Sequence, residues 1–165
     1  MTAWQATCCK GQGEMMKISE ILSPSLVKLD VRAEDKEELF EEMVQLFVNN
    51  GQITDREAAV TALLEREAKM STGISRWLGL PHGKLAEARA ILIALGVSKK
   101  GLEYDSLDGE PVYVIITIFA EMGNPGPHIQ ALAEISRLFA IPGVIAKIRQ
   151  AQTAQQVIDI IKNEE

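Results

Sequence analysis

Residues 112–120, with the sequence VYVIITIFA, constrain the fold more than any other segment of the chain. Six of these nine residues are β-branched and none is charged. A charge-free, β-branched run of this length is typical of a strand that is buried on both faces of a sheet. Asp108-Gly109 supplies a turn just before it. We therefore expect a central strand with helices packed against both of its faces.

The rest of the chain alternates shorter strands with helices. Strands are expected at 26–30, 76–80 and 89–96. Helices are expected at 33–51, from Thr54 to about Met70, from Pro127 onward, at 144–150 and after Thr153. Strands mixed with helices in this way indicate an α/β fold. The expected architecture is a single-domain sandwich, in which a mixed β-sheet is flanked by helices on both faces.

Capping patterns and apolar stripes define the expected helices. Asp35 followed by Glu38 resembles a capping box, Thr54 to Glu57 forms a full T-x-x-E box, and Thr153 precedes Gln156 by three residues. Pro127 suits the first position of a helix. The apolar stripe of the first helix is expected at Leu39, Phe40, Met43, Val44 and Phe47, and that of the helix after Pro127 at Ile129, Leu132, Ile135 and Phe139.

Length, charge and cysteine content exclude several classes of protein. The chain has 165 residues, 24% of them charged, and a net charge of −6, so it lacks the basic face expected of a nucleic-acid binder. No stretch approaches the ~20 apolar residues of a membrane span. Residues 1–14 are expected to be a flexible leader before a domain at 15–165.

The leader contains two neighbouring cysteines, Cys8 and Cys9. They suit neither a disulfide framework nor a zinc site, which favours a reducing cytoplasm.

Two histidines are the first candidates for chemistry, since the chain has no P-loop, GxGxxG, HExxH or GxSxG motif. His82 lies between Pro81 and Gly83, in a turn that could hold an imidazole at a strand end with its tip exposed. Neutral imidazole is nucleophilic near pH 7. His128 lies in the first turn of a helix, where free N–H groups suit a phosphate. From position alone, a structural role is favoured over a chemical one for each histidine.

Arg66, Ser71 and Thr72 are weaker candidates when they are considered alone. A guanidinium can bind phosphate oxygens in a bidentate fork, yet Arg66 could also be a solvated charge offsetting Glu65 and Glu67. The hydroxyls of Ser71 and Thr72 could face an anion, but the sequence Ser-Thr-Gly favours a turn.

Taken together, the segments REAKMSTGI, PHGKL and HIQALAEISRLF resemble the type-2 enzyme IIA family of the bacterial phosphoenolpyruvate-dependent phosphotransferase system. This is the fructose–mannitol group with its nitrogen-regulatory branch, and the resemblance covers roughly residues 16–164. It implies that His82 accepts a phosphoryl group from HPr or a nitrogen-branch HPr, that His128 assists, and that Arg66 stabilises the phosphate. It implies no cofactor and no metal.

One loop departs from the family pattern GIGxGIAIPHG. Ser75 and Trp77 replace two of its glycines, so the loop shape and the fit to a partner are expected to differ. We expect Trp77 to be exposed within an apolar patch around His82, where it could anchor a docking partner. Burial of Trp77 against the second helix is the alternative.

The expected function is that of a cytoplasmic phosphocarrier of the enzyme IIA type. It would serve either sugar phosphotransfer, with a IIB domain as acceptor, or nitrogen-related regulation through regulated target proteins. The alternative from another class is a regulatory binding module that has lost phosphotransfer, which the changes at Ser75 and Trp77 motivate. Neither function calls for nucleic acid or for insertion in a membrane.

Overall fold

Six strands form one mixed sheet in the computed structural model, which describes residues 15–165. The expected leader, 1–14, lies outside the described residues together with Cys8 and Cys9. The strands follow the order β1-β5-β6-β3-β2, and β4 pairs with β6 as well. Their bounds are β1 Val27–Lys28, β2 Gly73–Ser75, β3 Leu78–Gly79, β4 His82–Leu85, β5 Leu92–Leu102 and β6 Val112–Glu121.

Strand β6 is the centre of the sheet, as its sequence predicts. It runs antiparallel to β5 and parallel to β3 and β4, and its residues from Val114 to Ala120 are all buried. The other expected strands were less accurately placed. The strand expected at 89–96 starts later and continues to Leu102, the one at 26–30 shrinks to two residues, and 76–80 contributes only β3. Strand β4, which begins at His82, was expected as a turn.

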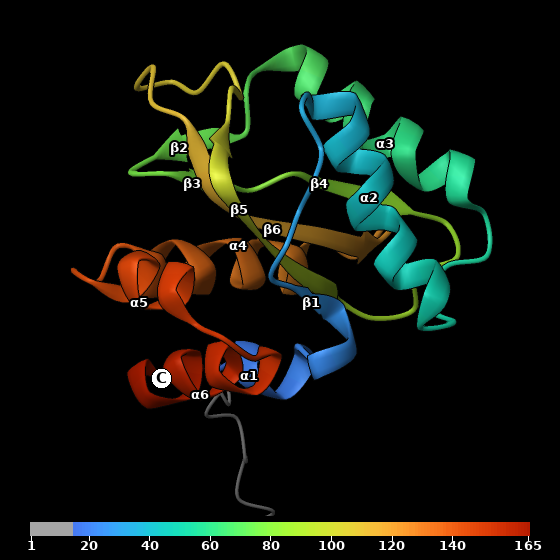
Figure 1. Ribbon diagram of the computed structural model, residues 1–165. Coiled ribbons are helices and arrows are strands. Elements are labelled where there is room, and N and C mark those ends of the chain that lie inside the picture. The colour runs from blue at the N-terminus through green and yellow to red at the C-terminus, as the bar shows by residue number, and fades with distance from the viewer. Residues whose placement is uncertain (1–14) are drawn as a thin grey trace, which may run out of the picture.

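Helices cover both faces of the sheet (Figure 1). Helices α2 and α3 contact β5 and β4 on one face, whereas α4 and α5 contact β6 on the other. Helices α1 and α6 pack against each other beyond α4 and α5. The α/β sandwich with a mixed sheet is therefore confirmed. The helix bounds are α1 Ile18–Ile21, α2 Lys36–Asn49, α3 Arg56–Lys69, α4 Pro125–Phe139, α5 Val144–Gln150 and α6 Ala154–Glu164, with a 3₁₀ turn at Pro24–Leu26.

Two of the expected helix caps are present and one is shifted by a residue. Asp35 accepts from the Glu38 N–H at 2.9 Å, and Thr153 accepts from the Gln156 N–H at 3.2 Å. At the start of α3 the cap is Asp55 rather than Thr54. The Thr54 hydroxyl instead donates to Glu87 in the β4–β5 connection at 2.6 Å. A carboxylate from a distant segment has thus replaced the local capping partner.

The apolar face of α2 was predicted correctly, and that of α4 was predicted correctly at Leu132, Ile135 and Phe139 but not at Ile129. All five expected α2 residues, from Leu39 to Phe47, have no exposed surface. In α4, which starts at Pro125 rather than Pro127, Ile129 is 64% exposed. The face that packs on the sheet starts one residue earlier, and it comprises His128, Ala131, Ile135, Leu138 and Phe139. His128 therefore points toward the sheet rather than toward solvent.

Within residues 15–165, no single helix is long and apolar enough to cross a bilayer. Helices α4 and α5 reach the required length and composition only as a pair, and they meet at an angle of 85°.

Candidate active site

His82 is the first residue of β4, a strand whose only pairing among the described residues is with β6. Its half-buried ring is held by a contact of 2.8 Å between Nδ1 and the Leu80 carbonyl oxygen. Because a carbonyl oxygen only accepts hydrogen bonds, Nδ1 carries the proton in this contact. The remaining nitrogen, Nε2, is then unprotonated and carries a lone pair. The local chain conformation of 80–82 thus selects Nε2 as the nucleophilic atom.

Gly83 allows α3 to approach β4 closely beside His82. A Cβ atom at Gly83 would lie 3.1 Å from the Cβ of Ala62, so α3 and β4 meet almost backbone to backbone. One turn further along α3, Arg66 reaches the histidine. Its Nε donates to Nε2 of His82 at 3.2 Å, and its Nη1 donates to the Met70 carbonyl oxygen at 2.9 Å.

His128 reaches the same point from the opposite face of the sheet. Successive residues of a strand point to opposite faces of the sheet. Because Gly83 faces α3, the side chain of His82 points away from α3. The rings of His82 and His128 lie edge to face, with centroids 5.4 Å apart and planes at 88°. Nε2 of His128 is buried and has no hydrogen-bond partner. The structure therefore brings together all three residues that the sequence singled out.

The start of α4 contributes less to an anion site than the sequence suggested. Its first four residues are Pro125, Gly126, Pro127 and His128. Proline has no backbone N–H, so two of the four donors that a helix start normally offers are missing here. The polar groups that the structure places against His82 are therefore the side chains of Arg66 and His128.

Burial makes both imidazoles easier to deprotonate. Burial lowers the pKa of His82, the positive Arg66 lowers it further, and the hydrogen bond to Leu80 and the charge of Glu67 oppose this. Burial also lowers the pKa of His128, with smaller effects from His82 and Lys84. Both rings are accordingly neutral near pH 7, which is the form of an imidazole that can act as a nucleophile.

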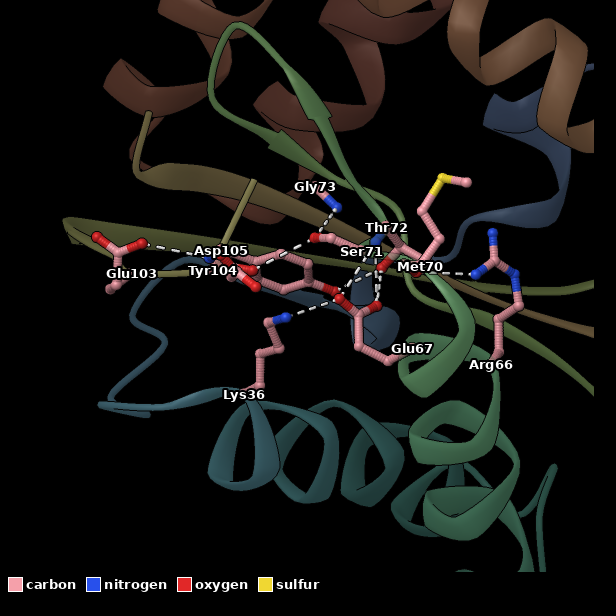
Figure 2. Close-up of polar contacts among 10 residues, drawn as sticks. All are labelled: Lys36, Arg66, Glu67, Met70, Ser71, Thr72, Gly73, Glu103, Tyr104 and Asp105. Carbon is pink, nitrogen blue, oxygen red and sulfur yellow. Dashed lines mark hydrogen bonds and ion pairs between the residues drawn. The ribbon is translucent and has the colours of Figure 1, made fainter. Parts of the chain in front are cut away.

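Ser71 and Thr72 take the turn role rather than facing an anion. The Ser71 hydroxyl accepts from the Gly73 N–H at 3.2 Å. Thr72 is 4% exposed, and its hydroxyl donates to Glu67. Glu67 and its ion-pair partner Lys36 were missed by the sequence reasoning, although Glu67 follows Arg66 directly (Figure 2).

Trp77 lies away from His82, which corrects one expectation. It is exposed to 38%, so exposure was predicted correctly. Its ring, however, packs on Tyr113 at 5.7 Å, and the Arg149 guanidinium lies 5.0 Å from the ring centre. Tyr113 is five residues before Ile118, the β6 partner of His82, which corresponds to roughly 16 Å along a strand. Trp77 therefore belongs to the far end of the sheet.

Among residues 15–165, no group of three His, Cys, Asp or Glu side chains is arranged to hold a metal ion. The polar groups around His82 are two imidazoles and a guanidinium. Such a set is suited to a phosphoryl group rather than to a cation.

Solved structures with this arrangement of strands and helices define the class of the protein. Nitrogen regulatory protein IIA-Ntr from Neisseria meningitidis superposes with a TM-score of 0.81 at 26% identity, covering 87% of this chain and 98% of that one. IIA mannitol from Escherichia coli has the same fold, with a TM-score of 0.71 at 21% identity, covering 84% and 97%. The fold is thus that of the mannitol and nitrogen-regulatory enzymes IIA.

The family follows from the sequence comparisons. The family model described as "Phosphoenolpyruvate-dependent sugar phosphotransferase system, EIIA 2" matches residues 20–164, and the chain belongs to this phosphocarrier family. It is 36% identical over 146 residues to the fructose-specific EIIABC component of Bacillus subtilis, covering 88% of this chain but only 23% of that protein. It is 30% identical to the fructose-specific EIIA component of Haloferax volcanii, covering 90% and 96%.

Proposed function

We propose that this protein accepts a phosphoryl group on Nε2 of His82 from a phosphorylated HPr-type protein in the cytoplasm, and then passes it on. The observation that carries the proposal is the hydrogen bond between Nδ1 of His82 and the Leu80 carbonyl oxygen. It leaves Nε2 unprotonated, with a lone pair that accepts from the Arg66 guanidinium, beside a second neutral imidazole.

The transfer needs no co-reactant beyond the phosphorylated donor. The Nε2 lone pair forms a bond to phosphorus while the phosphorus–nitrogen bond of the donor imidazole breaks, and that electron pair returns to the donor nitrogen. His82 keeps its Nδ1 proton and its bond to Leu80 throughout. Phosphoryl transfer depends mainly on alignment and on charge stabilisation of the equatorial oxygens. Arg66 and a protonated nitrogen of His128 are the groups placed to supply that stabilisation.

Exposed apolar side chains on the segments that carry the site support a protein as the phosphoryl donor. Ile129 follows His128 and is 64% exposed, while Met70, whose carbonyl holds Arg66, is 58% exposed. Met122, 59% exposed, comes directly after Glu121, which pairs with Leu85 at the other end of β4. Contiguous exposed apolar patches are typical of protein contact surfaces, and we propose that these three side chains contribute to one.

The downstream acceptor divides the proposal into two branches. A solved complex pairs the mannitol IIA of Escherichia coli with its phosphorylated IIB protein, and a relative from Bradyrhizobium diazoefficiens, 25% identical over 147 residues, is named a nitrogen regulatory protein. We propose a IIB domain or a regulated target protein as the acceptor, and neighbouring genes for IIB and IIC components would select sugar transport.

The test is phosphorylation with purified components. The protein is incubated with phosphoenolpyruvate, enzyme I and HPr, and its intact mass is measured. We expect a gain of about 80 Da, the mass of one phosphoryl group, which is lost in acid and is absent in His82→Ala. A wild-type protein that stays unlabelled with both HPr types would favour the alternative, a binding module without transfer. Full labelling of His82→Ala would move the acceptor to His128.

A further inference from the structure

A buried cluster behind the candidate site joins α2, α3 and Tyr104 in the connection between β5 and β6. Glu67 lies at its centre, with 7% of its side chain exposed. Its carboxylate accepts from Lys36 Nζ at 2.9 Å, from the Thr72 backbone N–H at 3.1 Å and from the Thr72 hydroxyl. Figure 2 shows these contacts converging on the carboxylate from both sides. Almost all the hydrogen-bonding capacity of this carboxylate is used within the protein.

The cluster continues from Thr72 to Tyr104. The Thr72 hydroxyl has one proton, which it donates to Glu67, so the Tyr104 hydroxyl must be the donor in its 2.8 Å contact with Thr72. Burial raises the pKa of Tyr104, and that keeps the phenol protonated for this role. Lys36 Nζ also lies 5.0 Å from the centre of the Tyr104 ring. Each polar side chain in this cluster therefore has a defined donor or acceptor role.

The cluster is linked to His82 through one short segment. The Glu67 carboxylate accepts a hydrogen bond from the Thr72 N–H. The carbonyl oxygen of Met70, two residues before Thr72, accepts one from the Arg66 guanidinium. Arg66 in turn donates to Nε2 of His82. A shift of the 70–72 segment would therefore move the arginine that the phosphoryl group needs.

Charge links the cluster to the site as well. The charged or titratable side chains near His82 and His128 are Arg66 and Glu67 from α3 and Lys84 from β4. A carboxylate with no counter-charge here would oppose an incoming phosphoryl group, which carries negative charge. Lys36, on α2, supplies the counter-charge at 2.9 Å.

We propose that Lys36 and Glu67 are a pair of positioning residues for phosphoryl transfer: Glu67 fixes the segment that holds Arg66, and Lys36 cancels the charge that Glu67 brings. The proposal rests on the proposed function. Neither residue touches the phosphoryl group, so the pair acts through Arg66 and through the electrostatic potential at His82.

Charge variants of opposite sign test the proposal. Lys36→Met leaves the carboxylate uncompensated, so we expect the pKa of His82 to rise and phosphorylation by phospho-HPr to slow about tenfold, less than the ~10²–10³ loss of a direct donor. Glu67→Gln leaves Lys36 uncompensated, so the pKa of His82 should fall. The double variant restores neutrality and should return the pKa of His82 to its wild-type position. The readouts are the NMR titration of the His82 imidazole and the rate of mass gain.

Lys28→Met is the matched control. Glu42 of α2 accepts from Nζ of Lys28 on β1 at 2.7 Å and from the Ala33 N–H at 2.9 Å, so this pair repeats the lysine–glutamate–backbone arrangement between β1 and α2. Its loss should leave both readouts as in wild type. The proposal is overturned if Lys36→Met matches Lys28→Met, or if the two single variants shift the pKa of His82 in the same direction. If Lys36→Met fails to fold, the test rests on the other two variants. The proposal is then overturned if the pKa of His82 does not fall in Glu67→Gln, or does not return to its wild-type position in the double variant. Wild-type labelling at His82 reports separately on the proposed function.

Discussion

Nε of Arg66 lies 3.2 Å from Nε2 of His82, the atom that would have to attack phosphorus. In the unphosphorylated protein the arginine N–H therefore occupies the lone pair that the reaction uses. The second anchor of the guanidinium, the Met70 carbonyl, is neutral and lies on an exposed residue. A modest shift of the side chain would free Nε2 and leave the same N–H groups directed at the phosphoryl oxygens. Arg66 would thus protect the acceptor nitrogen before transfer and stabilise charge during it.

Arg66→Lys should show that the forked shape of the guanidinium matters and not only its charge. A lysine ammonium cannot donate to His82 and Met70 in the planar geometry that Arg66 uses. We expect phosphorylation to slow by ~10²–10³ in Arg66→Lys and in Arg66→Gln alike, with the label remaining on His82. The rate is measured by quench flow with phospho-HPr. A wild-type rate in Arg66→Lys would reduce the role of Arg66 to charge alone.

His128→Ala should slow transfer while leaving His82 as the labelled residue. Nε2 of His128 is buried without a partner beside the His82 ring, and we expect its N–H form to donate to a phosphoryl oxygen. Loss of one such donor costs ~10²–10³ in rate. His128→Gln retains a side-chain N–H and should recover part of the rate. Equal rates in His128→Ala and wild type would make His128 a packing residue.

Stability should decrease with acidity in the range where the two histidines titrate. Burial lowers the pKa of both His82 and His128 in the folded protein, below the unfolded value of about 6.5. The unfolded chain therefore binds more protons than the folded protein just below that pH. The contribution of the two histidines to the free energy of unfolding is fully present above about pH 6.5 and is lost as the pH falls. Urea unfolding between pH 7.5 and 5 measures the loss. The double variant His82→Gln, His128→Gln should be less sensitive to pH in this window.

Trp77→Gly should change stability little and phosphorylation not at all. Arg76 and Trp77 form the tip of the β2–β3 hairpin with φ values of 50° and 73°, in the left-handed region that favours glycine. Glycine would relieve about 1 kcal/mol of strain. It would also remove the ring contacts with Tyr113 and Arg149, worth about 1–2 kcal/mol together. The expected net change is a loss within about 1 kcal/mol in denaturant unfolding. A slower phosphorylation rate would show that this distant hairpin reaches the site.

Gly83→Val should disturb transfer through helix α3. Added side-chain atoms would press on Ala62, where even a single Cβ would come within 3.1 Å. Because the contact includes the Ala62 backbone, α3 must move away from β4 and carry Arg66 with it. We expect a loss of about 1–3 kcal/mol in unfolding free energy together with slower phosphorylation. Gly109→Ala provides a control for losing a glycine, since a Cβ there meets open space and the cost is local strain at its φ of 74°.

The sequence alone predicted elements whose pattern is local. Residues 112–120 were recognised as the central strand because a β-branched, uncharged run carries its own information on burial. The buried face of α2 and the caps at Asp35 and Thr153 followed from spacings of three and four residues. The resemblance carried by REAKMSTGI, PHGKL and HIQALAEISRLF identified the family and drew attention to Arg66, His82 and His128.

Tertiary structure decided what depends on contacts between distant segments. The meeting of His82 and His128 requires β4 to pair with β6 and α4 to turn His128, not Ile129, toward the sheet. The position of Trp77 was mispredicted because separation along the chain cannot show that β3 and β4 pair with different stretches of β6. Lys36 and Glu67 are 31 residues apart. In sequence each looks like an ordinary charge on an amphipathic helix, and only the packing of α2 against α3 buries them together beside the site.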